Sequence, residues 1–340
     1  MKVTLLISFL FLPLGLINAN GQEYLPVLCF HSFYEEEPDN GTLSESYARL
    51  EELLNFLKSN GYQSITHHDS RDEHQIMLTF DDGHKSQYKA AGLLEEFGFR
   101  GVFFIVPGLI NDPEYDHLTK KQIRDLADRG HEIGIHGYNH ESVVESRKEL
   151  KRSLDISGKE FHRLTGLDIE IISFAFPFGH YDTESFQELN QEYLYLHTVN
   201  PGYWDGTSAN VPRLLISRQK ELSFYFDYIK QSRKFKPAVY FEYSDANRSR
   251  QSQVNISIDE NLDPNAMYLL SPAADISGKH YKPRTLSNFF EKKNERYSIN
   301  LSDFVAEFYK EERSVLSLAI VQLHEDEIIY LSNGELFWID

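Results

Sequence analysis

The chain has 340 residues, with 34 basic and 52 acidic side chains, a formal net charge of −18 and 41% hydrophobic residues. This length exceeds that of most single domains, so we expect two domains. The acidic balance argues against nucleic acid or anionic lipid as the main partner, because both are themselves negatively charged. Cys29 is the single cysteine, so no intramolecular disulfide can form and the fold depends on its core.

The N-terminus has the pattern of a secretory signal peptide, which we place at residues 1–21. Lys2 precedes an apolar run that ends at Ile17, and small and polar residues follow it. Such a run is short for a membrane-spanning helix. Cleavage would leave Gln22 as the first mature residue of a secreted, periplasmic or cell-surface protein with no stable membrane insertion. An uncleaved anchor is the alternative.

Residues 22–235 alternate apolar strand-like runs with helical patterns. This alternation predicts a parallel sheet covered by helices, either a barrel or an open doubly wound sheet. In both architectures the ligand site lies at the carboxyl ends of the strands. Strands are expected at 24–31, 75–80, 100–106, 131–136, 169–176 and 193–199, and helices at 44–61, 85–98, 119–130, 143–164 and 183–191.

Residues 236–340 have a different pattern, dominated by short strands, and we interpret them as a smaller β-rich domain. Asn333-Gly334 lies between two apolar runs and predicts a hairpin turn. This domain could bind glycan, dock on another subunit or cap the larger domain.

Ionisable side chains follow several of the expected strands. Asp81 and Asp82 follow the run QIMLTF, while His136 and His140 lie in HGYNH after another strand. Asp-Asp-Gly is also good turn and N-cap material. However, one carboxylate and two imidazoles are a common ligand set for catalytic zinc, and the second carboxylate would then be free to act as a base. We therefore expect a divalent metal ion here, with zinc as the first candidate.

TFDDG, HGYNH and FAFPFG, in this order, resemble the NodB-homology polysaccharide deacetylases, carbohydrate esterase family four, over residues 25–235. PVLCFH, FPFG and TVNPG resemble the poly-N-acetylglucosamine de-N-acetylase branch, in which a histidine motif is moved to the N-terminal strand. The resemblance implies a distorted (β/α) barrel with fewer than eight full units. It also implies that water activated at a metal ion attacks an N-acetyl carbonyl, releasing acetate and a free amine.

The same resemblance assigns roles to individual residues. Asp81 matches the catalytic base, and His31 matches the histidine that protonates the departing amine. The metal ligands match Asp82, His136 and His140.

Further residues are expected around the substrate. Phe178 and Gly179 match the groove motif, with the Phe178 N–H holding the oxyanion. Trp204 lies in the Gly-rich NPGYWDG and is a candidate for stacking on a sugar ring, although such aromatic residues are often packed into the protein instead. His197 ends a strand and is either a second proton donor or a hydrogen-bonded core residue.

One position departs from the family pattern. Many members have an arginine two residues before the proline of the groove motif, where it pairs with the base, and this chain has Ala175 there. Arg213, in NVPRLLIS, is a candidate substitute; the alternative is an ordinary exposed arginine at a strand end.

The leading hypothesis is a metal-dependent deacetylase acting on the N-acetyl groups of an N-acetylglucosamine-containing polymer. An O-acetyl esterase on the same scaffold is the first alternative. A non-catalytic carbohydrate-binding protein is the second, favoured by Ala175 and disfavoured by the intact set of acids and histidines.

Overall fold

The computed structural model describes most of the first 242 residues and separate strands beyond them. The predicted signal peptide, residues 1–21, lies outside the described residues and stays a prediction. Within the described part, no helix is both long and apolar enough to cross a membrane. The described ranges are 24–36, 43–112, 116–156, 159–242, 253–258, 267–270, 284–285, 290–293, 296–300, 315–324 and 327–338.

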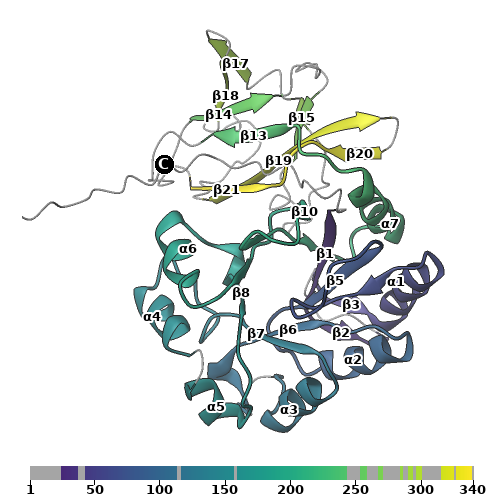
Figure 1. Ribbon diagram of the computed structural model, residues 1–340, viewed down its shortest axis with the longest axis vertical. Coiled ribbons are helices and arrows are strands. Elements are labelled where there is room, and N and C mark those ends of the chain that lie inside the picture. The colour runs from purple at the N-terminus through teal and green to yellow at the C-terminus, as the bar shows by residue number, and fades with distance from the viewer. Residues whose placement is uncertain are drawn as a thin grey trace, which may run out of the picture.

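The larger domain is a nearly closed barrel of parallel strands (Figure 1). Its sheet has the order β10-β1-β5-β6-β7-β8-β9-β11, with β12 also paired to β1 and β4 to β5. The predicted distorted barrel is therefore confirmed. The strands are β1 (Leu25–Phe30), β4 (Gln63–Ser64), β5 (Gln75–Phe80), β6 (Val102–Ile105), β7 (Glu132–Ile135), β8 (Ser173–Ala175), β9 (Tyr195–His197), β10 (Tyr203–Trp204), β11 (Asn210–Val211) and β12 (Leu214–Leu215), with a separate pair β2 (Phe33–Tyr34) and β3 (Glu45–Ser46).

One short segment, residues 210–215, closes the barrel. Its first half, β11, pairs in parallel with β9, and its second half, β12, pairs in parallel with β1. Arg213 lies between the two halves, at the seam. Its side chain is fully buried, so the closure of the barrel carries a guanidinium into its interior.

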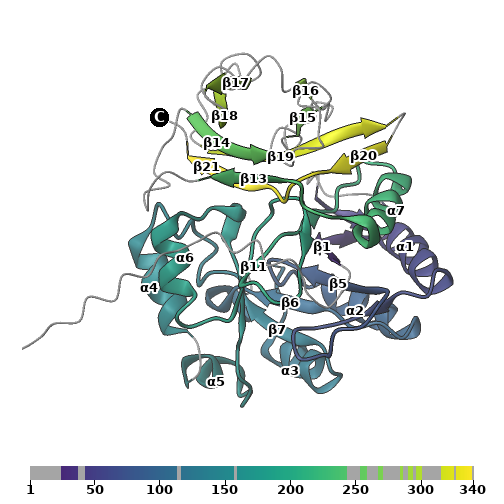
Figure 2. The ribbon, with the colours of Figure 1, turned by 45° about the horizontal axis from the view of Figure 1, so that its top comes forward.

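The helices surround the sheet on its outer side (Figures 1 and 2). Side-chain caps start four of them, at Ser46, Thr119, Ser146 and Asp182. The single helix expected at 143–164 is wrong: α4 ends at Asp155 and α5 begins at Lys159. Gly158 lies between them in the sequence, and glycine is unfavourable inside a helix. The helices are α1 (Tyr47–Ser59), α2 (Gln87–Glu96), α3 (Lys120–Asp128), α4 (Arg147–Asp155), α5 (Lys159–Thr165), α6 (Thr183–Leu189) and α7 (Leu222–Gln231), with short 3₁₀ turns η1 (Pro107–Leu109), η2 (Pro177–Gly179) and η3 (Ser232–Lys234).

Strands β1 and β5 are buried along their whole length, as expected for parallel strands covered on both faces. Leu28 and Phe30 of β1 belong to the large core cluster that includes helix residues. Val27 and Met77 belong to a smaller cluster that contains no helix residue and includes Phe104. The second cluster fills the inside of the barrel and supports the strand ends from below.

The C-terminal part forms two antiparallel sheets that lie beside β10 and α7 (Figures 1 and 2). The β-rich character predicted for it is confirmed. The first sheet has the order β13-β14-β18-β17 and the second β16-β15-β19-β20, with β21 also paired to β19. Their bounds are β13 (Val239–Glu242), β14 (Gln253–Ile258), β15 (Met267–Leu270), β16 (Arg284–Thr285), β17 (Phe290–Lys293), β18 (Arg296–Asn300), β19 (Val315–His324), β20 (Glu327–Tyr330) and β21 (Glu335–Trp338).

The hairpin predicted at Asn333-Gly334 is wrong. Strands β20 and β21 both pair with β19, and the register shifts by two residues between them, so Asn333-Gly334 lies in a bulge of one long partner strand. The bulge contacts the barrel: Asn333 accepts a bond from the Tyr203 N–H (2.8 Å) and donates to its carbonyl (3.1 Å). Gly334 donates to the carbonyl of Pro201. Contact with the barrel therefore overrides the local turn preference.

Replacing Asn333 by alanine is expected to destabilise the protein, because the Tyr203 backbone loses both hydrogen bonds. We expect the free energy of unfolding to fall by about 1–3 kcal/mol, measured by urea denaturation. Asn55→Ala is the matched control: Asn55 is exposed and bonds only within its own helix, so the change should stay below about 0.5 kcal/mol. Equal effects of the two substitutions would contradict this role of the bulge.

Candidate active site

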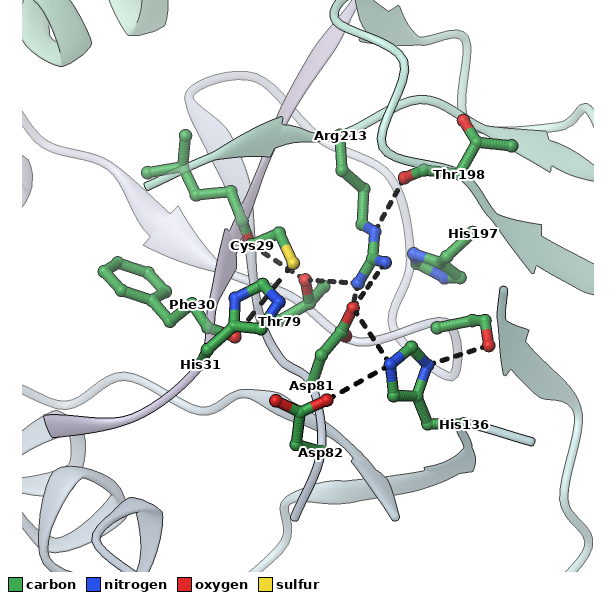
Figure 3. A network of polar contacts seen from close by, with 12 residues as sticks. Cys29, Phe30, His31, Thr79, Asp81, Asp82, His136, His197, Thr198 and Arg213 are labelled. Atoms are coloured by element: carbon green, nitrogen blue, oxygen red, sulfur yellow. Dashed lines mark hydrogen bonds and ion pairs between the residues drawn. The ribbon is translucent and has the colours of Figure 1, made fainter. Parts of the chain in front are cut away.

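The residues predicted to form the site follow the carboxyl ends of different barrel strands. His31 follows β1, Asp81 and Asp82 follow β5, and His136 follows β7. The N–H of Asp81 donates to the Phe30 carbonyl (2.9 Å) and the N–H of His136 to the Ile105 carbonyl (2.8 Å), so sheet bonding continues into the site. Figure 3 shows these side chains facing one another.

Asp82, His136 and His140 come together as one donor set. The Nε2 atoms of His136 and His140 lie 3.3 and 3.2 Å from Asp82 Oδ1, and the three donor atoms lie within 4.8 Å of one another. His136 Nδ1 lies 2.9 Å from the Ala175 carbonyl oxygen and therefore donates to it, which directs Nε2 toward Asp82.

This donor set fits a divalent cation. When its only ring proton is on Nδ1, His136 presents an Nε2 lone pair to Asp82 Oδ1, and a cation between the two atoms satisfies both; without a cation, a second proton on the imidazole takes that place. Burial opposes a charge on Asp82, but hydrogen bonds with His136 and His140 outweigh it and hold the pKa of Asp82 well below its usual value. Burial likewise opposes a charge on His136, while Asp81 and Asp82 raise its pKa.

Arg213 pairs with Asp81 in the barrel interior (Figure 3). Its Nη1 and Nη2 atoms lie 2.6 and 2.7 Å from the two carboxylate oxygens, the bidentate geometry of strong arginine–carboxylate pairs. Bonds to Thr79 Oγ1 (3.1 Å) and the Thr198 carbonyl (2.9 Å) hold the guanidinium in place. Burial alone would raise the pKa of Asp81, but Arg213 outweighs it and lowers that pKa to about 2.

His31 and Cys29 lie on the other side of Asp81 (Figure 3). The donor atoms of Cys29, His31 and Asp81 are within 4.8 Å of one another. Burial lowers the pKa of His31, although Asp82 and Asp81 oppose the shift. Burial raises the pKa of the Cys29 thiol, which therefore stays protonated.

Phe178 lies in η2, directly after β8. Its side chain is 57% exposed, and its ring meets the His140 ring edge-on at 4.6 Å. Among the described residues, its N–H has no hydrogen-bond acceptor. Gly179 has a φ of +69°, and a Cβ there would lie 2.2 Å from Val199, so only glycine allows this turn.

Two expected side chains lie away from the metal ligands. Trp204 is 2% exposed and its indole N–H donates to the Ser208 carbonyl; the prediction that it stacks on a sugar is wrong, because its ring is packed into the barrel. His197 is fully buried, contacts the Phe104 ring at 4.7 Å and lies 3.0 Å from His67 between Nε2 atoms. Burial holds its pKa well below the usual value.

Two buried polar residues that the sequence reasoning missed hold the loops of the site. The Gln87 amide donates to the carbonyls of His31 (2.8 Å) and Asp81, which joins the ends of β1 and β5. The Glu149 carboxylate accepts from the N–H groups of Tyr138 and Asn139 within HGYNH. Neither residue belongs to a motif; the only available signal was a polar residue at a core position of a helix.

Comparisons with known proteins find polysaccharide deacetylases among the similar sequences. Residues 68–195 match the family model for polysaccharide deacetylase. The chain is 24% identical to YxkH of Bacillus subtilis over 52% of its length, and 22% identical to the poly-beta-1,6-N-acetyl-D-glucosamine N-deacetylase of Escherichia coli K12 over 59%. It spans 65% and 38% of these two relatives, less than two thirds of each.

Solved structures share the fold. A polysaccharide deacetylase from Bacillus cereus aligns with a TM-score of 0.54 at 22% identity, over 61% of this chain and 69% of that one. A de-N-acetylase from Aggregatibacter actinomycetemcomitans aligns with a TM-score of 0.54 at 20% identity, over 61% of this chain and all of the other. At these identities the likeness establishes the barrel alone.

Removing Arg213 is expected to leave Asp81 buried without a counter-charge. Arg213→Met should lower the free energy of unfolding of the metal-free protein by about 3–5 kcal/mol at pH 7, and adding Asp81→Asn should recover part of it. Because the folded pKa of Asp81, about 2, lies below its unfolded value of about 3.9, this stabilisation is complete above about pH 5. It is lost as the pH falls toward 2, so wild type and Arg213→Met should converge there.

Arg147→Met is the control for this prediction. Arg147 is exposed and pairs with exposed Glu184 and half-buried Glu188, and surface pairs of this kind contribute about 0–1 kcal/mol. Urea denaturation between pH 2 and 7 measures all variants. An Arg213→Met effect no larger than that of Arg147→Met would contradict the interpretation.

Proposed function

We propose that this chain, which carries a polysaccharide deacetylase domain of the NodB-homology family, is a metal-dependent hydrolase that removes N-acetyl groups from an N-acetylglucosamine-containing polysaccharide and releases acetate. The observation that carries the proposal is the donor set Asp82, His136 and His140 directly beside the buried pair of Asp81 and Arg213. We further propose that the protein acts outside the cytoplasm, after removal of residues 1–21.

Asp82, His136 and His140 would hold the metal ion, for which zinc is the first candidate. When bound, such an ion polarises a carbonyl and makes water easier to deprotonate. Asp81 is suited to take the proton from the attacking water, because Arg213 keeps it ionised and fixes its orientation. The exposed N–H of Phe178 is the candidate donor to the carbonyl oxygen as negative charge develops on it.

Hydrolysis also needs an acid, because an amine leaves easily only when it is protonated. Water adds to the carbonyl carbon, the C–N bond breaks, and the nitrogen must receive a proton as acetate forms. His31 follows β1 and lies on the side of Asp81 opposite His136 (Figure 3), and we assign this transfer to it. His197 is disfavoured because it is packed between Phe104 and His67.

Asp81→Asn is expected to keep the metal and lose most activity, because an amide cannot accept the proton. Acetate release from N-acetylglucosamine oligomers should fall by about two to four orders of magnitude, while zinc content, measured by mass spectrometry, stays near one ion per chain. Asp82→Asn is the matched control at the neighbouring carboxylate and should lose both metal and activity. A thermal melting curve of each variant shows whether Arg213, which loses its carboxylate partner in Asp81→Asn, destabilises the fold.

Near-full activity of Asp81→Asn would refute its role as base. Acetate release from O-acetylated polymer but not from N-acetylated oligomers would instead support the esterase alternative. Absence of acetate from both substrates in zinc-loaded protein would favour a protein that binds carbohydrate without hydrolysing it.

The acid is tested by comparing His31→Ala with His197→Ala. Activity that needs protonated His31 falls as the pH rises through its pKa, which burial lowers. His31→Ala should therefore reduce kcat/KM by at least about a hundredfold and remove this alkaline limb of the profile. His197→Ala should keep the limb, and its loss in that variant alone would show the assignment to be wrong.

A further inference from the structure

A second cavity lies far from the candidate active site, between α7 and η3 of the barrel domain and β20 of the C-terminal sheets. Its volume is about 600 Å³, within the range of ligand-binding pockets. The floor consists of Tyr203, Phe235 and Tyr330, whose rings pack together at 4.8 and 5.9 Å from Tyr203. The cavity therefore combines an aromatic floor with contributions from both domains.

The rim is strongly basic in a chain that is otherwise acidic. Lys230, Arg233, Lys234 and Lys236 line it, with Asp227 as the one acidic lining residue. Four cations thus lie within seven consecutive residues, whereas the whole chain has 34 in 340 and a net charge of −18. The positive charge at the rim attracts anions locally, although the net charge of the whole chain repels them.

Two of the four cations that line the cavity have neither a carboxylate nor an aromatic ring as a partner among the described residues. Lys230 lies 3.6 Å from Asp227, and Arg233 lies over the Tyr62 ring at 5.3 Å. Lys234 and Lys236 are exposed and, among the described residues, have no carboxylate partner. Gln231, also in the lining, has a buried Oε1 atom with no hydrogen-bond donor. The cavity thus offers two unpaired cations and one unused polar group beside an apolar surface.

The position of the cavity separates it from catalysis. Tyr203 pairs with Pro26 at the start of β1, whereas His31 follows the end of β1. At about 3.3 Å per residue, the five residues from Pro26 to His31 put roughly 17 Å between the two sites. A polymer segment in the cavity is therefore not the segment undergoing hydrolysis.

We propose that this cavity binds an anionic glycan, through a carboxylate or phosphate group carried by a sugar-sized unit. The cations receive the anion, and the sugar unit lies against the apolar lining, in which Ile329 is half-buried and the aromatic rings are buried behind it. A polymer rich in free amines, the product of de-N-acetylation, is disfavoured because its charge has the same sign as the rim. The protein would thereby be held on an acidic matrix while its catalytic end stays free.

Isothermal titration calorimetry at low salt tests the proposal with three probes: tetragalacturonic acid, a tetramer of glycerol phosphate, and neutral maltotetraose, which has no N-acetyl group for the candidate active site to hydrolyse. We expect one or both anionic probes to bind, and the two arms distinguish carboxylate from phosphate. Lys234→Glu combined with Lys236→Glu should weaken binding by about tenfold or more. Acetate release from soluble oligomers should be unchanged in this double variant. The binding measurement needs no catalysis, so its outcome does not depend on the proposed catalytic function.

Lys148→Glu combined with Lys151→Glu is the matched control, because it changes the net charge equally on exposed positions of α4. It should leave binding of the anionic probes unchanged. Equal loss in both double variants, tighter binding of maltotetraose than of either anion, or no anion binding at millimolar concentration would each overturn the proposal. So would a dimer in sedimentation that only the Lys234/Lys236 variant dissociates, because the cavity would then be an interface with a second copy.

Discussion

The ion pair between Arg213 and Asp81 is the constraint on which the candidate site depends. Both side chains are buried, and a buried carboxylate stays ionised only where a positive charge compensates it. The guanidinium comes from the segment that closes the barrel, held by Thr79 on one side and Thr198 on the other. Barrel closure and ionisation of Asp81 are therefore coupled, because the seam between β11 and β12 brings Arg213 to Asp81.

Backbone conformation at the strand ends supports the same conclusion. Among the described residues, five non-glycine residues have a positive φ, and three of them, Asp82, His140 and Phe178, belong to the site. Such conformations are costly for residues with a Cβ and persist where the surrounding structure imposes them. Here the surroundings include the hydrogen bonds that the N–H groups of Tyr138 and Asn139, in the loop of His140, donate to the buried Glu149 carboxylate. The strain is concentrated where side chains must converge on one point.

The sequence predicted what strand order and motif chemistry determine. The barrel, the convergence of Asp82 with both histidines and the neighbourhood of His31 all follow from short motifs placed after apolar strands. Prediction from the sequence failed where contacts between residues far apart in the chain determine the local structure. Asn333-Gly334 has strong turn propensity, yet its bonds to the barrel make it a bulge, and Trp204 lies in a Gly-rich stretch, yet its ring is buried. Glu149 and Gln87 carry no local signal, because their partners are backbone groups brought near only by folding.

This chain has Ala175 at a position where many NodB-homology deacetylases have an arginine, and the structure gives this difference a physical explanation. Ala175 ends β8 without exposed surface, and its carbonyl orients His136. A second guanidinium at this position would compete with Arg213 for one carboxylate in the same interior, and the two cations would repel each other. The small side chain at 175 and the arginine at 213 are thus complementary, since the barrel interior accommodates one cation beside Asp81. The absence of the motif arginine is consistent with an intact site whose cation comes from another strand.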